Sequence, residues 1–244
     1  MELYIEKLND IFEKENICSS HGIDHAVNVL KNINNMLDCS KLEMTEDQKF
    51  STRLAGLLHD ADDRKFFKNN KNYENAREIM KDLPENIINM AIRMIDLTSA
   101  SKNKDSTPDD VIKFPWLLYP RHADRLEAIG KIGILRSWQY TRGIKMIYYN
   151  DKTARCKNID EIKKVASLER YNNYKGISYS MIDHYYDKLF MIGSFKTENE
   201  YAENLRIQRM KPIINILIEF GKKGIINDDM IMNFLEKTED ENIK

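Results

Sequence analysis

The sequence Leu57-Leu58-His59-Asp60-Ala61-Asp62-Asp63-Arg64-Lys65-Phe66 joins an apolar run to an adjacent imidazole and carboxylate. Such a His–Asp pair is a weak signal alone, because the dipeptide is common by chance. Two flanking segments add to it. His21 and His25 lie upstream, four residues apart, so that a helix would place both imidazoles on one face. Asp124 lies downstream, in the segment Arg121-His122-Ala123-Asp124-Arg125-Leu126.

His25, His59, Asp60 and Asp124 together form an ordered set of two imidazoles and two carboxylates. Neutral imidazoles and ionised carboxylates in these numbers balance a divalent cation and leave about two of six octahedral positions for water and a phosphate oxygen. Mixed nitrogen and oxygen ligation suits Mn, Co, Fe, Ni or Zn, and Mg remains open. Taken one by one, a histidine on an apolar helix face is more often a core residue than a ligand, and Asp124 is more readily a helix cap or an ion-pair partner.

The order of these four residues resembles the HD-domain superfamily of metal-dependent phosphohydrolases. The similarity extends to a branch of small stand-alone HD hydrolases implicated in nucleotide hydrolysis. It covers roughly residues 20–220 and is carried by three segments, Leu58–Phe66, Asp124–Ile134 and Ser180–Leu189. The resemblance implies that His25, His59, Asp60 and Asp124 are the metal ligands.

The same resemblance implies a phosphohydrolase that acts on a small phosphorylated substrate, a nucleotide above all. Cleavage of a nucleoside triphosphate to the monophosphate and pyrophosphate by a metal-bound water is the leading expectation. A nucleotide 5′-phosphomonoesterase, a signalling-nucleotide hydrolase and a non-catalytic metal-binding scaffold are the alternatives. HD enzymes with two metals carry extra histidines between the HD pair and the last Asp. Only His122 lies there in this chain, so one metal is expected.

The resemblance also implies roles around the metal. Besides the ligand Asp60, Asp63 is the candidate that orients or deprotonates the attacking water, and His21 could contact phosphate or donate a proton. An ordinary surface position is the alternative for each. The candidates for binding the phosphate groups are Lys65, Arg125, His184, Lys188 and Arg209. Any of these cations could instead form an ion pair of little consequence, and His184 could be a buried structural residue.

Composition sets the class of protein. The 244 residues are 42% hydrophobic and 32% charged, which is typical of a soluble globular chain with a sizeable core. A net charge of −1 predicts no attraction to a nucleic acid polymer or an anionic membrane. Three scattered cysteines indicate a reducing compartment.

With no signal pattern and no apolar run of about 18 residues, a cytoplasmic location is expected. Apolar helices near both ends would allow a homodimer.

Helical periodicity predicts an all-α fold, since no strand-like alternation exceeds about four residues. We expect one HD-type domain over residues 1–244, a bundle of roughly eight to eleven helices with its core at about 20–220. Residues 98–113 break the pattern and are expected as a loop, either a lid or a surface excursion. Residues 236–244 are expected to fray.

Caps and helix breakers define the expected helix boundaries. Gly130 and Gly133 are expected to let a neighbouring helix approach. In the first half of the chain the expected helices cover 3–17, a segment capped by Ser19 or Ser20 whose apolar stripe reaches Leu37 and carries His25 inward, a segment from the Thr45–Gln48 capping box to the His59-Asp60 pair, 72–81, and a helix with Pro84 at its first position. In the second half they cover 117–140, 161–168, Ser178 or Ser180 to Ile192, a helix from the Thr197–Glu200 capping box to a stop at Gly221 with a kink at Pro212, and 228–235.

Overall fold

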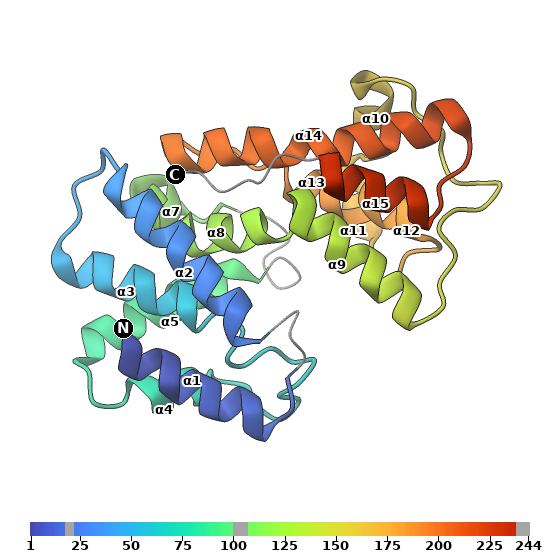
Figure 1. Ribbon diagram of the computed structural model, residues 1–244. Coiled ribbons are helices and arrows are strands. Elements are labelled where there is room, and N and C mark those ends of the chain that lie inside the picture. Colours follow the sequence, from blue (N-terminus) through green and yellow to red (C-terminus); the bar gives the residue numbers. More distant parts are fainter. Residues whose placement is uncertain (18–21, 100–106, 238–244) are drawn as a thin grey trace. The chain divides into compact units, whose positions relative to one another are not determined.

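The chain is all-α, as the periodicity predicted. The computed structural model describes residues 1–17, 22–99 and 107–237, and these contain helices and no strand (Figure 1). They divide into two compact units, the first made of Met1–Asp124 with Asn199–Ala202 and the second of Arg125–Glu198 with Glu203–Lys244. Among the described residues, none of the helices combines the length and the apolar character needed to cross a bilayer.

The first unit is a bundle in which α3 packs against α2 and α5, and α1 packs against α2 and α4. The predicted capping box of α3 is present, because Thr45 accepts the N–H of Gln48 while the Gln48 side chain accepts the N–H of Thr45. The helices of this unit are α1 (Glu2–Lys14), α2 (Ile23–Asp38), α3 (Glu46–Leu57), α4 (Glu74–Met80), α5 (Glu85–Thr98), α7 (Asp109–Lys113), the 3₁₀ turn η2 (Pro115–Leu118) and α8 (Tyr119–Glu127) as far as Asp124.

A glycine sets the depth at which α3 lies against α2. A Cβ atom built on Gly56 would come within 1.8 Å of Ile33 Cδ1, so only hydrogen leaves room for the fully buried Ile33 side chain. Glycine in a helix interior costs about 1 kcal/mol relative to alanine, and close packing of the two helices offsets that cost. This contact brings the end of α3 near the first turn of α2.

Three boundaries in the first unit differ from prediction. The N-cap of α2 is Gly22 rather than a serine, and Ser19 and Ser20 lie outside the described residues. Helix α3 ends at Leu57, so the His–Asp pair lies in the turn that follows. The expected loop over 98–113 is partly wrong, since Thr98 belongs to α5 and residues 109–113 form the short helix α7. The side chain of Asp110, on α7, pairs with Arg93 on α5. Residues 100–106 lie outside the described part.

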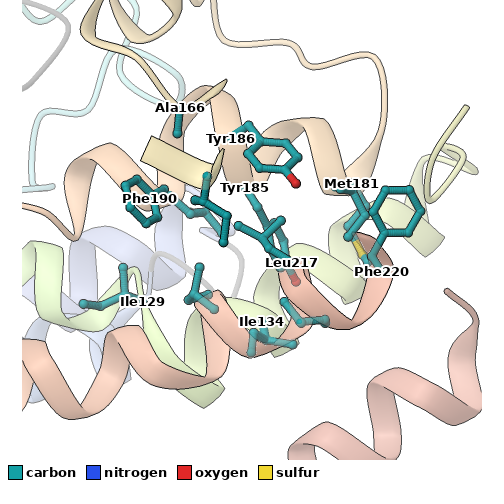
Figure 2. Close-up of a cluster of buried hydrophobic side chains, with 14 of the residues drawn as sticks. Ile129, Ile134, Ala166, Met181, Tyr185, Tyr186, Phe190, Leu217 and Phe220 are labelled. Atoms are coloured by element: carbon teal, nitrogen blue, oxygen red, sulfur yellow. The ribbon is translucent and has the colours of Figure 1, made fainter. Parts of the chain in front are cut away.

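The second unit is built around α14 and the segment of α12, η3 and α13, in which η3 is a π-helical turn. Figure 2 shows Tyr185, Phe190 and Leu217 within its apolar core, together with Ile129 and Ile134. The helices are α9 (Gly130–Gly143), α10 (Ile159–Val165), α11 (Leu168–Asn173), α12 (Met181–His184), η3 (Tyr185–Leu189), α13 (Phe190–Ile192), α14 (Glu200–Lys223) from Glu203, and α15 (Asp228–Lys237).

The predicted helix over 117–140 is wrong because the chain breaks between α8 and α9. Ile129 is extended and Gly130 has a φ of 74°, a value that favours glycine. A Cβ on Gly133 would lie 2.3 Å from the carbonyl oxygen of Ala128. Both glycines therefore serve this tight turn, and a Cβ on Gly133 would meet the backbone of Ala128 and not a neighbouring helix. The predicted helix near 161–168 is likewise two short helices, α10 and α11.

Helix α14 begins and ends differently from prediction. The carboxamide of Asn199, not Thr197, caps it by accepting the N–H of Ala202. The helix continues past Pro212 and past Gly221 to Lys223. Gly221 does not stop it, because its missing side chain admits the carbonyl oxygen of Cys156, 1.8 Å from where a Cβ would stand.

The C-terminal signal is instead Gly224, whose φ of 73° places it in the left-handed region. Its N–H donates to the carbonyl oxygen of Phe220. Of the two serines predicted as alternative caps, Ser178 and Ser180, the cap of α12 is Ser180, whose hydroxyl accepts the N–H of Asp183. Helix α15 reaches Lys237, inside the tail that was expected to fray, and residues 238–244 lie outside the described part.

Candidate metal centre

Four side chains of the first unit meet at one place. His25 lies in the first turn of α2, His59 and Asp60 in the turn after α3, and Asp124 on α8. Helix α8 is tied to α5 by a hydrogen bond of 2.6 Å from Arg121 Nε to the Leu97 carbonyl oxygen. The three chain segments are thus held by the bundle itself.

The donor atoms of the four residues lie within hydrogen-bond or ion-pair range. His25 Nε2 is 3.2 Å from His59 Nε2, 3.3 Å from Asp124 Oδ1 and 3.9 Å from Asp60 Oδ2. His59 Nε2 is 3.5 Å from Asp60 Oδ2 and 3.6 Å from Asp124 Oδ1. Each imidazole nitrogen therefore faces the other imidazole and both carboxylates.

These distances fit the coordination shell of a small divalent ion. Neighbouring ligands at about 2.1 Å from a metal are about 3.0 Å apart in an octahedron and about 3.4 Å apart in a tetrahedron. His25, His59 and Asp60 each offer one donor atom, all within 4.8 Å of one another, and Asp124 adds a fourth next to both histidines. The donor set and its spacing could hold one ion with little movement.

A backbone contact fixes the orientation of His59. Its Nδ1 lies 2.8 Å from the carbonyl oxygen of Gly56, to which it donates. This leaves Nε2 as the nitrogen that faces the cluster, the arrangement usual for a metal-ligating histidine. Gly56 therefore acts twice, through its missing side chain toward Ile33 and through its carbonyl toward His59.

The electrostatics of the cluster favour a bound cation. Burial alone would lower the pKa of His59, but the charges of Asp60 and Asp124 outweigh it and raise that pKa to about 10. Burial would raise the pKa of Asp124, but hydrogen bonds to His25 and His59 hold it well below its usual range. The side chains of His25 and His59 are 7% and 2% exposed, against 20% for Asp60 and 33% for Asp124, so the site opens on its carboxylate side.

Asp63 and Lys65 lie just beyond the cluster and contact each other. Asp63 Oδ1 accepts the backbone N–H of Lys65 at 2.9 Å, and Asp63 Oδ2 is 3.6 Å from Lys65 Nζ. The Lys65 side chain is 64% exposed, which makes this ion pair a weak one. His21, the other predicted catalytic group, lies outside the described residues.

The remaining predicted phosphate-binding residues belong to the second unit. Arg209 is buried and its Nη1 donates to Glu127 Oε1 at 2.8 Å and to the carbonyl oxygen of Leu126 at 2.7 Å. These contacts favour a structural ion pair that holds the end of α8. Arg125 is also buried, on the same helix.

His184 and Lys188 lie on either side of the start of the π-helical turn. His184 Nδ1 is 3.3 Å from Tyr174 Oη and 3.4 Å from Ser178 Oγ. Burial, with a smaller contribution from Lys188, lowers the pKa of His184 to about 4. An imidazole with this pKa is neutral near pH 7, so His184 brings no positive charge to a phosphate there.

Two residues near the cluster were missed by the sequence analysis. Gly56 left a signal, because a glycine inside a helical pattern costs stability and calls for a packing reason. Asp62 left none. Its carboxylate accepts the backbone N–H groups of Asn75 and Ala76. Since these partners are backbone groups, the residue types at positions 75 and 76 do not indicate the contact.

Comparison with known proteins gives a relative and two solved structures. The chain is 36% identical over 222 residues to the uncharacterized protein L803 of Acanthamoeba polyphaga mimivirus, which covers 83% of this chain and 88% of the viral protein. A Lactobacillus plantarum protein solved by structural genomics matches with a TM-score of 0.63 at 19% identity, over 91% of this chain and 95% of that one.

The Lin1889 protein of Listeria innocua matches with a TM-score of 0.56 at 20% identity, over 93% of this chain and 98% of that one. At these sequence identities the two structures support only the assignment of the helical fold. No family model matches the sequence.

Proposed function

The chain belongs to the same family as the mimivirus protein L803, and from its His–His–Asp–Asp cluster we propose that it is a divalent-metal-dependent phosphohydrolase. The substrate class is small nucleotides, and the location is the cytoplasm. One observation carries the proposal. His25, His59, Asp60 and Asp124 come from three distant segments, yet each histidine nitrogen lies within 3.9 Å of the other histidine nitrogen and of both carboxylates.

In this proposal His25 and His59 would hold the ion through the Nε2 atoms that face each other, while Asp60 and Asp124 would supply the negative charge that balances it. A bound ion of the Mn, Co, Fe, Ni, Zn or Mg type lowers the pKa of water and withdraws charge from a phosphoryl group. The 20% and 33% exposure of the two carboxylates leaves the open side from which a phosphate would approach.

Asp63 and Lys65 complete the proposed chemistry from the turn that carries Asp60. A carboxylate there can orient water for in-line attack on phosphorus and accept its proton. The exposed ammonium of Lys65 can leave its weak pairing with Asp63 to neutralise charge on the phosphate. We propose cleavage of a nucleoside triphosphate at the α-phosphate, which yields the monophosphate and pyrophosphate.

A nucleotide panel tests this proposal. Purified protein with Mn²⁺ or Co²⁺ is incubated with nucleoside tri-, di- and monophosphates, and phosphorus NMR identifies the products. Monophosphate with pyrophosphate is the expected pair, and a chelator should stop the reaction. Inorganic phosphate from monophosphates would instead indicate a phosphomonoesterase.

Matched variants locate the activity. Asp60→Asn should lower the rate by about 100-fold or more, because it removes a ligand charge. Asp38→Asn changes an exposed carboxylate at the end of α2 and should leave the rate unchanged. Equal activity of Asp60→Asn and the wild type would refute the site. Metal binding without hydrolysis of any compound would favour a non-catalytic scaffold.

A further inference from the structure

We propose that Asp62 is a positioning residue for the cluster, which anchors the turn of His59 and Asp60 to the N-terminus of α4. Asp62 Oδ1 accepts the backbone N–H of Asn75 at 3.0 Å, and Oδ2 accepts that of Ala76 at 3.0 Å. Oδ1 also accepts from Asn70 Nδ2 at 2.6 Å. The inference rests on the proposed metal site.

Helix α4 needs a cap from elsewhere in the chain. Its own N-cap residue is Tyr73, which has a φ of 61° and makes no side-chain cap hydrogen bond. The first backbone N–H groups of a helix have no partner within it, and a carboxylate satisfies them and complements the helix dipole. Asp62, 13 and 14 residues before its two backbone partners, takes this place.

The contact is reciprocal, which makes the anchor rigid. Asn75 Nδ2 donates to the carbonyl oxygen of Ala61 at 2.8 Å, so that α4 holds two consecutive residues of the turn. Within the turn, the N–H of Ala61 donates to Leu58 O and that of Asp63 to Asp60 O, each at 3.1 Å. The turn that contains Asp60 is therefore held both by its own backbone hydrogen bonds and by helix α4.

Helix α4 is itself fixed in the first unit. Ala76, Ile79 and Met80 are buried, and Tyr73 Oη donates to Asp96 Oδ1 on α5 at 2.5 Å. A metal ligand set is sensitive to small displacements, because each ligand must stay within a few tenths of an ångström of its bonding distance. Loss of the Asp62 anchor should thus loosen Asp60, while the other three ligands keep their supports.

Asp62 and its neighbour Asp63 have different parts in this arrangement. The Asp63 carboxylate contacts its near neighbour Lys65, whereas the Asp62 carboxylate contacts groups that lie eight or more residues away along the chain. The first is placed to act on a substrate, and the second is placed to hold the backbone.

Titration calorimetry with Mn²⁺ alone, at a temperature well below the melting transition, tests the proposal without any turnover. Asp62→Ala should weaken Mn²⁺ binding about tenfold or more. Asn75→Ala, which removes only the bond to Ala61, should weaken it less. Asp62→Asn keeps the volume but replaces one acceptor oxygen by a donor, and it takes the place of the alanine variant if that one fails to fold.

The control is a cap of the same kind in the second unit. Asn158→Ala removes the N-cap of α10, whose side chain accepts the N–H of Glu161 at 3.0 Å. Asn158→Ala and Asp62→Ala should each lower the melting temperature by about 3 °C. Asn158→Ala alone of the two should leave the affinity for Mn²⁺ unchanged.

The outcomes separate this inference from the proposed function. If the wild type binds no Mn²⁺ or other divalent ion, the metal site itself is wrong. If the wild type binds Mn²⁺ and Asp62→Ala binds it within twofold, only the positioning role is overturned. An equal loss of affinity in Asn158→Ala would also overturn it, since general destabilisation would then explain the effect.

Discussion

His25 Nε2 lies 3.2 Å from His59 Nε2, although the two residues are 34 positions apart in the chain. Their rings meet edge to face, with centroids 5.1 Å apart. Since His59 donates its Nδ1 proton to the carbonyl oxygen of Gly56, its Nε2 is the nitrogen that faces the other imidazole. Two nitrogens at this separation are stable only with a proton or a cation beside them. The pair therefore requires a shared proton or a cation, and the cluster could hold a metal ion at this point.

Metal binding should stabilise the protein, because the ion binds the folded cluster and not the separated residues. Mn²⁺ at about 100 times its Kd should add about 2.7 kcal/mol, seen as a rise in melting temperature. His25→Ala should abolish the rise, whereas Asp38→Asn should preserve it. An unchanged rise in His25→Ala would place metal binding elsewhere.

Gly56→Ala should loosen the cluster through the helix packing beneath it. The new Cβ would meet Ile33 Cδ1, and the overpacking should cost about 1–3 kcal/mol while weakening Mn²⁺ affinity. Adding Ile33→Val removes the clashing methyl group and should restore part of the lost stability and part of the lost Mn²⁺ affinity. Denaturant unfolding and calorimetry measure the two effects, and a double variant no better than Gly56→Ala would contradict this account.

Two glycines of the second unit should respond in opposite ways to alanine. Gly221→Ala should cost about 3 kcal/mol or more, because the Cβ meets the backbone of Cys156, which cannot move aside easily. Gly143→Ala meets nothing within 4 Å near the end of α9 and should be neutral or stabilising by up to about 1 kcal/mol. Urea unfolding compares them directly.

Stability should fall as the pH is lowered from about 6.5 to about 4, partly because of His184. Burial lowers its folded-state pKa to about 4, so over this range the unfolded chain binds a proton that the folded chain does not. His184→Gln removes that difference and should flatten the dependence of unfolding free energy on pH. An identical slope in wild type and variant would show that another group is responsible.

The Arg209–Glu127 pair should behave as a structural ion pair. Arg209→Met should cost about 3–5 kcal/mol, since it leaves the buried Glu127 carboxylate without this partner. Adding Glu127→Gln should recover part of the loss, as a double-mutant cycle in urea would reveal. Full stability of Arg209→Met would remove the structural assignment and return Arg209 to the candidate phosphate ligands.

Much of the local structure was predictable because its causes lie within a few residues. The apolar periodicity predicted the helices, and the side chains of Thr45 and Ser180 cap α3 and α12 with partners three residues away. The histidines and aspartates of the cluster could be proposed together because their types and order carry chemistry. Boundaries failed where a competing cap or glycine lay close by, as with Asn199 and Gly224.

The parts that resisted prediction depend on groups remote in the chain. Gly56 is explained only by Ile33 on another helix, Gly221 only by the backbone of Cys156, and Asp62 only by two N–H groups of α4. A backbone N–H or carbonyl group has the same chemistry at every residue, so the pattern of side chains in the sequence could not predict these contacts. Packing selects them, because a buried polar group or a close helix approach is stable only when its partner is in place.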